Sequence, residues 1–444
     1  MRRTIVLLTT MALTVLVASG VVLAAGIGSA GAQGSIVGPG ESIQKAVNAA
    51  DPGDTIVVRG VHREDVVIRK NGIKLHGEHA VIEAPPRAKA DSPCSKTFGP
   101  EAICVLGDVN IESGELTGQR VSDVSVSGFT IRGFNIKGKG DNTAFVIDVT
   151  GARNATFVGN RITGNVASGI VASGSVNTTL AKNHVIGSPE TAEGIVVDSS
   201  SRTKIVNNVV RKNNVFGIAV FDSPGTKMLS NTTRRNEVVG VYVEDSPGTK
   251  ILSNDVSRSG NTGIVIFGPE RANNDAKVVG NRISGGPWGI WVANAHGGSF
   301  TGNTIHDNCA GMFFEAFPSE PVGDFEVKGN TVENNTRKCP AGVDQGREAF
   351  SGIGIALLGA SGMELTGNQI SGNIPSGPTP VSGGVVVSTN PFYGGSAKAQ
   401  PRNNSVIGNH FGHNKPDIFW DDSGSGNRFL GNLCDTSVPS SLCN

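Results

Sequence analysis

The stretch GIAVFDSPGTKMLSN at residues 217–231 is followed by a second version of itself, GVYVEDSPGTKILSN, at residues 240–254. Eleven of the fifteen positions are identical, and the four changes lie at positions 218, 219, 221 and 228 of the first copy. The Asn that closes each copy recurs at nearly regular intervals along the chain, at Asn160, Asn183, Asn208, Asn231, Asn254, Asn281, Asn303, Asn330, Asn368, Asn409 and Asn432. These intervals run from 22 to 41 residues and are most often 23. Periods of about 20–50 residues are the sequence signature of a stacked repeat array.

Each repeat contains three short apolar segments, of which GIVVDS, TKIVN and NRIT are examples. The segments alternate apolar and polar residues and are bounded by Gly, Asn, Asp or Ser, which is typical of short strands. A repeat as short as the opening pair has no room for a useful helix beside three strands. The pattern therefore predicts an all-β solenoid of about 10–13 three-sided coils, stacked about 4.8 Å apart.

The recurring Asn residues are predicted to point inward and to form hydrogen-bonded columns along the stack. A second column lies five positions further on, at Asn165, Asn213, Asn236, Asn308, Asn335, Asn373 and Asn414. We assign both columns a structural role. A solenoid also needs covers at its open ends, and residues 42–50 have the apolar spacing of a short amphipathic capping helix.

Residues 1–32 have the features of a secretory signal peptide. Two arginines precede a long apolar run, and Ala30-Gly31-Ala32 is a suitable cleavage site. The alternative is an uncleaved membrane anchor, because the run from Ile5 to Ala25 is long enough to span a bilayer. The expected organisation is a signal peptide at 1–32 and a single domain at 33–444, with a cap at 33–60, coils at 61–432 and a second cap at 433–444.

Six cysteines remain in the exported chain, and they fall into three local pairs: Cys94 with Cys104, Cys309 with Cys339, and Cys434 with Cys443. An even number of cysteines in an exported chain favours disulfides. No pair has the CxxC spacing of a zinc site. We interpret the pairs as disulfides, and reduced buried thiols are the alternative.

The repeats, the cap and the stretch GDTIVVRGVHREDVVIRKNGIKLHGE at residues 53–78 resemble the right-handed parallel β-helix superfamily over residues 36–434. This group includes pectate-lyase-like and alginate-epimerase-like proteins and periplasmic β-helix repeat proteins. The resemblance implies a right-handed coil and, if the chain is an enzyme, a polysaccharide lyase, glycoside hydrolase or epimerase. The Asp-Pro-His-Asp signature of alginate epimerases and the polygalacturonase motifs are absent from the sequence, so the resemblance rests on scaffold residues.

The outward positions of the first segment carry the candidate binding residues. Aromatic rings that recur on one face of neighbouring coils suit stacking on sugar rings, and the alternative is that a loop covers them. The substrate-binding candidates are Tyr242, Trp291, Phe313, Phe221, Phe267 and His296, the last of which follows the same segment.

The candidate catalytic residues are Asp198, Glu244 and Glu315 in the next outward column, and Arg347 on the longest insertion. Insertions beside the first segment place long loops on this side of the stack, where function is usually found. Lysines begin the second segment of four successive coils: Lys204, Lys227, Lys250 and Lys277. A basic edge of this kind would suit an acidic polysaccharide, and the alternative is that the long side chains extend into solvent without a binding role.

These features predict a secreted or cell-envelope β-helix protein that binds, and could process, a polysaccharide. A non-catalytic structural or surface-binding solenoid is the alternative, and the sequence leaves open whether the chain is an enzyme. No cofactor or metal is expected, apart from Ca²⁺ if the protein is a lyase. The net charge of zero favours neither nucleic acid nor membrane as a partner, and we expect a monomer.

Overall fold

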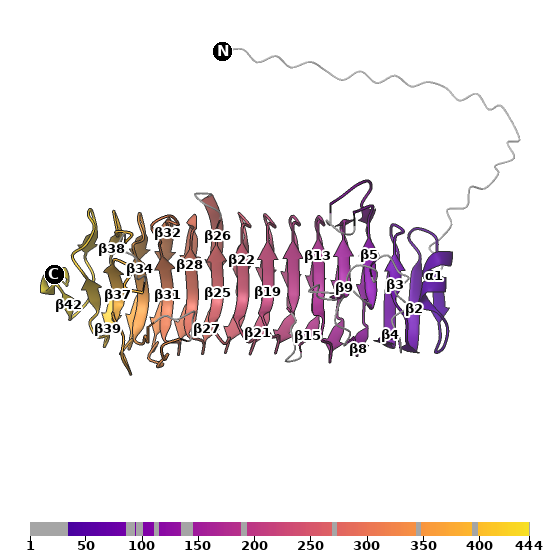
Figure 1. Cartoon of the computed structure of the whole chain (residues 1–444), viewed down its shortest axis with the longest axis horizontal. Coiled ribbons are helices and arrows are strands. Elements are labelled where there is room, and N and C mark those ends of the chain that lie inside the picture. Colours follow the sequence, from indigo (N-terminus) through magenta and orange to yellow (C-terminus); the bar gives the residue numbers. More distant parts are fainter. Residues whose placement is uncertain are drawn as a thin grey trace, which may run out of the picture.

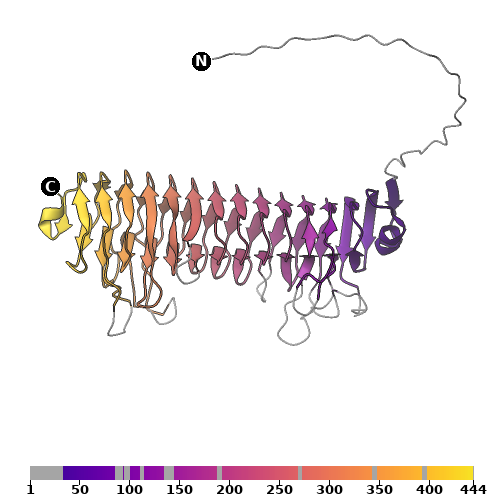
Figure 2. The ribbon, with the colours of Figure 1, turned by 90° about the horizontal axis from the view of Figure 1, so that it is seen from above.

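The computed structural model of the 444-residue chain describes residues 34–85, 94, 101–110, 115–134, 145–187, 193–268, 273–342, 348–392 and 398–443. The predicted signal peptide and the candidate residue Arg347 lie outside the described residues. The described part forms one long stack of coils, with the helix at one end and the C-terminus at the other (Figure 1). Seen from above, the strands of successive coils run side by side along the whole stack (Figure 2).

One face of the stack is a sheet of fourteen parallel strands, which we call the first sheet. This number of strands is larger than the predicted number of coils, 10–13, because the described strands at the ends of the sheet lie outside the Asn series that marks the repeat. Its strands are β3 (Val66–Ile68), β5 (Ile103–Leu106), β9 (Phe145–Thr150), β13 (Ser168–Ser173), β16 (Ile195–Asp198), β19 (Phe216–Phe221), β22 (Val239–Glu244), β25 (Thr262–Phe267), β28 (Trp288–Ala293), β31 (Ala310–Glu315), β34 (Ile353–Leu358), β37 (Gly383–Ser388), β40 (Ile418–Trp420) and β42 (Ser437–Val438).

The other two segments of each coil form a second, larger parallel sheet. Its strands are β1 (Gly34–Val37), β2 (Thr55–His62), β4 (Lys74–Glu83), β7 (Ser125–Ser127), β8 (Thr130–Arg132), β11 (Thr156–Val158), β12 (Arg161–Thr163), β14 (Thr179–Ala181), β15 (His184–Ile186), β17 (Lys204–Val206), β18 (Val209–Arg211), β20 (Lys227–Leu229), β21 (Thr232–Arg234), β23 (Lys250–Leu252), β24 (Asp255–Ser257), β26 (Asn273–Val279), β27 (Arg282–Ser284), β29 (His296–Thr301), β30 (Thr304–His306), β32 (Gly323–Lys328), β33 (Thr331–Glu333), β35 (Glu364–Thr366), β36 (Gln369–Ser371), β38 (Ser405–Ile407), β39 (His410–Gly412) and β41 (Arg428–Leu430). Two short strands, β6 (Val121–Ser122) and β10 (Ala152–Arg153), pair separately.

The two copies of the repeated sequence stack in register. Ile218 pairs with Val241, and Ala219 with Tyr242, between β19 and β22. The inward residues Ile218 and Val241 are buried in the continuous apolar core, because side chains alternate between the two faces of a strand. The changes at the inward positions therefore exchange one apolar residue for another, while the outward positions are free to vary.

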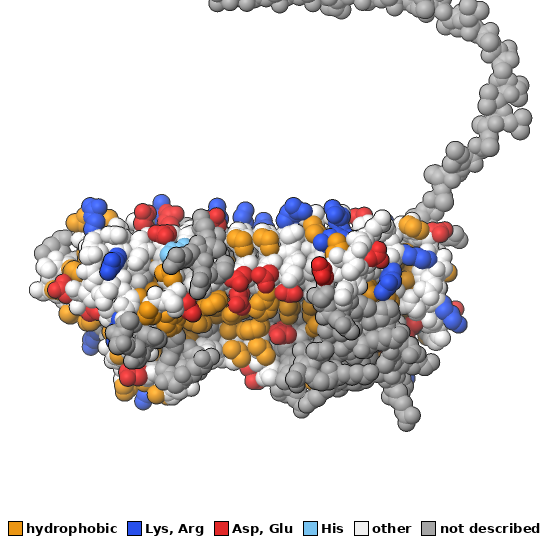
Figure 3. Space-filling view, turned by 45° about the horizontal axis from the view of Figure 1, so that its top comes forward, with side chains coloured by type: hydrophobic (Ala, Val, Ile, Leu, Met, Phe, Trp, Pro, Cys, Tyr) orange, Lys and Arg blue, Asp and Glu red, His pale blue; other side chains and the backbone are white. Residues whose placement is uncertain are grey.

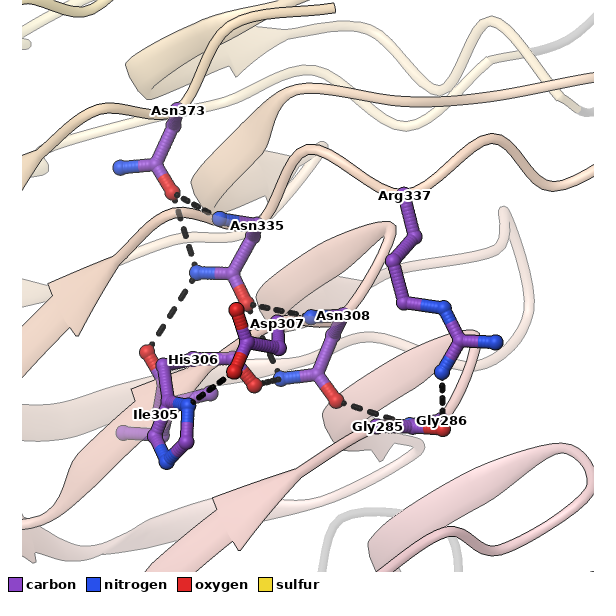
Figure 4. Close-up of polar contacts among 9 residues, drawn as sticks. All are labelled: Gly285, Gly286, Ile305, His306, Asp307, Asn308, Asn335, Arg337 and Asn373. Atoms are coloured by element: carbon purple, nitrogen blue, oxygen red, sulfur yellow. Dashed lines mark hydrogen bonds and ion pairs between the residues drawn. The ribbon is translucent and has the colours of Figure 1, made fainter. Parts of the chain in front are cut away.

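The predicted Asn columns are confirmed as hydrogen-bonded ladders. The Nδ2 of Asn231 donates to Oδ1 of Asn254 at 3.0 Å and to the carbonyl oxygen of Ile205 at 2.8 Å. In the second column, Asn308, Asn335 and Asn373 repeat the arrangement on successive coils (Figure 4). Each amide thus bonds the coils on both sides, which satisfies polar groups that would otherwise be buried without partners.

The N-terminal cap contains the helix α1 (Ile43–Ala49), as the sequence predicted. The Ser42 side chain caps it by accepting a hydrogen bond from the Lys45 amide. The Glu64 carboxylate also accepts hydrogen bonds from the first amides of the helix, including that of Ile43 at 2.7 Å. No helix within the described residues is long and apolar enough to cross a membrane.

All three predicted cysteine pairs form disulfides: Cys94–Cys104, Cys309–Cys339 and Cys434–Cys443. The Cys309–Cys339 bond belongs to a second apolar cluster, formed on the outer side of the first sheet by residues that include Phe313 and Phe350. Part of the outer face is therefore covered rather than open.

Candidate binding groove

The outer face of the first sheet carries three columns of side chains in register. Two are the predicted columns, which include Tyr242 paired with Val265 and Glu244 paired with Phe267. The third comes from the residue before the Gly near the start of the strands, for example Phe216 before Gly217. In the middle of the stack an apolar band is visible along this face, with a group of acidic side chains above it (Figure 3).

A groove of about 550 Å³ lies along this band. Its floor comes from strands β19, β22, β25 and β28, and its far end from β31 and the residues that follow. It is lined by Phe216, Val238, Val239, Tyr242, Asn261, Thr262, Val265, Phe267, Trp291, Glu315, Phe317, Glu320 and Phe392. Aromatic and carboxylate side chains therefore share one concave surface.

Stacked aromatic rings form the N-terminal end of the groove. The rings of Phe216 and Tyr242 are 4.8 Å apart and nearly parallel, at 23°. Phe221 packs against Tyr242 at 5.5 Å. The Tyr242 hydroxyl donates a 2.9 Å hydrogen bond to Oε2 of Glu244, which fixes the orientation of the ring. Burial, and then this bond to Glu244, raise the pKa of Tyr242, so its hydroxyl remains a donor.

Trp291 and Glu315 form the C-terminal end of the groove. The indole Nε1 of Trp291 donates a 3.0 Å hydrogen bond to Oε2 of Glu315, and Nδ2 of Asn390 donates a 2.8 Å bond to Oε1. Glu315 is only 1 % exposed, whereas Trp291 is partly exposed. Both carboxylate oxygens therefore accept bonds that hold the indole ring in place.

Asp198 and Glu244 lie on either side of Phe221 in one column of the first sheet, and Asp222 and Asp245 directly follow Phe221 and Glu244 at the N-terminal edge of the groove. Burial raises the pKa of Asp198, its hydrogen bond with Ser199 lowers it in part, and the nearby Asp222 raises it further. Burial, and then Glu244, likewise raise the pKa of Asp245. The edge thus has a negative potential, which disfavours an approaching anion.

The structure brings together Tyr242, Trp291, Phe267 and Glu315 of the predicted site residues in the groove lining, with Phe221 and Glu244 against Tyr242. Three other described candidates do not line the groove. Asp198 lies on β16, which contributes no lining residue. Phe313 faces outward as expected but is covered, at 1 % exposure, by the cluster around Phe350. His296 begins β29 on the second sheet, where its Nδ1 lies 3.1 Å from Asp324, and it is not among the groove-lining residues.

Several lining residues were not predicted from the sequence. Phe216 and Thr262 precede the Gly of their repeats, and the side chain before this Gly faces outward, a regularity that the sequence does contain. Phe317, Glu320 and Phe392 come from segments between strands, and only the folded chain places them against the groove.

The predicted basic edge is in register but does not border the groove. Lys204, Lys227 and Lys250 pair successively at the start of β17, β20 and β23 in the second sheet. No Lys or Arg is among the described residues that line the groove. The lysine column, which favoured an acidic polysaccharide, therefore lies on the second sheet and not beside the aromatic residues of the groove.

The parallel coils and the outward groove define the chain as a right-handed parallel β-helix protein. Residues 99–256 and 225–392 match the family described as right handed beta helix region. These matches together cover more than half of the 444 residues, and the chain belongs to this family. No match to a curated protein sequence was found.

The chain is similar to solved structures at low sequence identity. The A-module of the mannuronan C-5 epimerase AlgE6 of Azotobacter vinelandii is 17 % identical, with a TM-score of 0.56 over 89 % of this chain and 93 % of that one. DFA-IIIase of Arthrobacter chlorophenolicus A6 in complex with DFA-III is 14 % identical, with a TM-score of 0.48 over 86 % and 95 %. At these identities the similarity concerns the fold alone.

Proposed function

We propose that this protein is an exported saccharide-binding β-helix, and that the groove between Phe216 and Trp291 holds a glycan chain. The observation that carries the proposal is the partly exposed Trp291 ring, which two hydrogen bonds on Glu315 hold beside an aromatic floor. A rigid aromatic ring can stack on the apolar face of a sugar, and the carboxylate of Glu320 in the lining can accept sugar hydroxyls.

The groove suits a neutral glycan better than the acidic polymer that the lysine column had indicated. A uronate would meet Glu320 and the nearby Glu244 without a described Lys or Arg in the lining to neutralise it. Desolvating a carboxylate beside other carboxylates is costly. Neutral sugars instead supply hydroxyl donors for these acceptors.

Binding is the role that the geometry supports best. Glu315 is buried and already accepts two bonds, so it acts as a positioning residue for Trp291. Glu244 similarly accepts the Tyr242 hydroxyl. The epimerase among the similar structures acts on mannuronan by its printed name, which is consistent with a saccharide partner. Three disulfides are consistent with export.

The test is binding to a panel of neutral and acidic polysaccharides by affinity electrophoresis and calorimetry. Trp291→Ala and Phe216→Ala should each weaken binding to a neutral member by about five- to thirtyfold, because each removes a stacking surface worth about 1–2 kcal/mol. Trp420→Ala is the matched control, since Trp420 lies on β40 and packs on Phe429 away from the groove.

The proposal is wrong if both groove variants bind every polysaccharide as the unaltered protein does while the far-UV spectrum is unchanged. Preferential binding of an acidic polymer, weakened by the groove variants, would support the groove as the binding site. It would contradict the proposal that the ligand is a neutral glycan. Release of reducing ends or unsaturated products, measured in the same samples, would show that the protein also processes the chain.

A further inference from the structure

A second group of reactive side chains lies near the N-terminal end of the first sheet, outside the saccharide groove. It consists of Cys94, Glu101, Cys104 and Asp148, which we call the thiol–carboxylate cluster. One potential ligand atom from each residue lies within 4.8 Å of those from the other three, and all four residues are buried. The two cysteines form a disulfide in this structure.

Neighbouring coils bring these residues together. Cys104 on β5 pairs directly with Asp148 on β9, and both side chains face outward from the sheet. The Thr150 hydroxyl donates a 2.7 Å hydrogen bond to Oδ1 of Asp148. The other oxygen, Oδ2, lies 3.9 Å from Sγ of Cys104. Asp148 is thus held with one oxygen toward the sulfur.

Glu101 is the unusual member of the cluster. It is 2 % exposed, and neither carboxylate oxygen has a hydrogen-bond partner among the described residues. A buried carboxylate without a partner is costly unless it is neutralised or bound to a cation.

Opening the disulfide would convert this group into a set of two thiolates and two carboxylates. Zn²⁺ takes such donors tetrahedrally, at about 2.3 Å to sulfur and about 2.1 Å to oxygen, so ligand atoms lie about 3.4–3.8 Å apart. The observed spread of 4.8 Å and the Cα–Cα separation of 6.6 Å between Cys94 and Cys104 require only small side-chain movements to reach this geometry.

We propose that the reduced chain binds one thiophilic divalent cation of the Zn²⁺ type at the thiol–carboxylate cluster, and that the disulfide and the metal exclude each other. The thiol form exists in the newly made chain before oxidation. It can also be regenerated by a phosphine, which takes up an oxygen atom from water as phosphine oxide while the disulfide gains two electrons and two protons. Metal binding then displaces the two thiol protons. This site is independent of the proposed saccharide groove.

The experiment measures Co²⁺ and Zn²⁺ binding by the full-length mature chain before and after reduction with a non-chelating phosphine. A variant with serine at Cys309, Cys339, Cys434 and Cys443 leaves only the proposed thiol pair. The expected result is one metal ion per reduced chain, with thiolate-to-Co²⁺ charge-transfer bands, and at least about a tenfold lower affinity of the oxidised chain.

Glu101→Gln and Asp148→Asn distinguish the folded site from two free thiols. Each should weaken binding to the reduced chain by about tenfold or more, because each removes a ligand. Glu193→Gln is the control, since Glu193 bonds Ser168 outside the cluster. Equal affinity of the two ligand variants and the unaltered reduced protein would overturn the proposal, including the case where reduction unfolds the chain, because an unfolded thiol pair is indifferent to Glu101. Equal binding by the oxidised chain would overturn it too.

Discussion

The indole Nε1 of Trp291 on β28 donates a 3.0 Å hydrogen bond to Oε2 of Glu315 on β31, one coil further along the stack. Neither residue could hold this geometry alone, since the opposite oxygen of Glu315 is fixed by Asn390, 75 residues further along the chain. The exposed ring and the buried carboxylate therefore form one unit, in which the carboxylate sets the position of the ring.

Glu315→Gln should destabilise the protein by about 1–3 kcal/mol. The glutamine amide can offer only one acceptor oxygen to two donors, which leaves the indole or the Asn390 amide facing an N–H group in a buried site. Urea unfolding followed by tryptophan fluorescence measures the effect. The exposed Glu348 supplies the control variant Glu348→Gln, which should lie within about 0.5 kcal/mol of the unaltered protein. Equal midpoints for the two variants would contradict the role given to Glu315.

Asn231→Ala should lower the free energy of local unfolding of the coils around residue 231 by about 2–4 kcal/mol. Its side chain accepts from Asn208 and donates to Asn254 and to the Ile205 carbonyl, so truncation leaves several buried groups unpaired. Native-state hydrogen exchange should show faster opening of the coils around residue 231. Asn432→Ala at the partly exposed end of the same column should have a smaller effect. Similar exchange changes in both variants would show that the ladder does not stabilise the interior.

Tyr242→Phe should keep saccharide affinity within a few-fold, whereas Tyr242→Ala should lower it by about tenfold or more. The first variant retains the stacking with Phe216 and loses only the hydroxyl bond to Glu244, while the second removes the ring. Calorimetry with the best polysaccharide of the panel separates the two. If the phenylalanine variant lost as much affinity as the alanine variant, the hydroxyl rather than the ring would be the main contact.

Asp198→Asn should stabilise the protein at neutral pH and leave it unchanged at pH 3. Because burial raises the folded-state pKa of Asp198 above its usual 3.8, its favourable contribution is present below the unfolded-state pKa and is lost as the pH rises through the folded-state pKa. The side chain is partly exposed, so screening limits the gain to a few tenths of a kcal/mol. Thermal unfolding at several pH values tests this, and a gain that is equal at pH 3 and pH 7 would contradict it.

Replacing Cys309 and Cys339 by serine should uncover the apolar cluster over Phe313. The disulfide closes a loop with a sequence separation of 30 residues. Removing it should lower the free energy of unfolding by about 3–4 kcal/mol, because the unfolded chain gains entropy. It also holds the Cys339 backbone, which exchanges two 3.1 Å hydrogen bonds with Phe350. Binding of a hydrophobic dye and cleavage by a protease should both increase. The Cys434 and Cys443 double variant is the control, because that bond lies at the C-terminal end.

The fold could be predicted from the sequence because it is written locally and repeatedly. Apolar residues with a period of two, turns rich in Gly and Asn, and the recurring Asn specified each coil, and stacking fixed the register of the next. The three disulfides were also foreseen, since each joins cysteines that are close in sequence. The outward columns that contain Tyr242 and Glu244 followed from the same alternation.

What covers each part of the outer face was decided only by the tertiary structure. Phe313 and Trp291 are direct neighbours in one column. Phe313 is buried inside the apolar cluster, against Trp288 and Phe392, whereas Trp291 packs at the margin of that cluster and lines the groove. Glu101 and Asp148 likewise meet only because parallel coils place distant residues side by side. The repeat period determined where the side chains of the repeated strands point, whereas the long-range packing of non-repeating segments determined which outward side chains remain in contact with solvent.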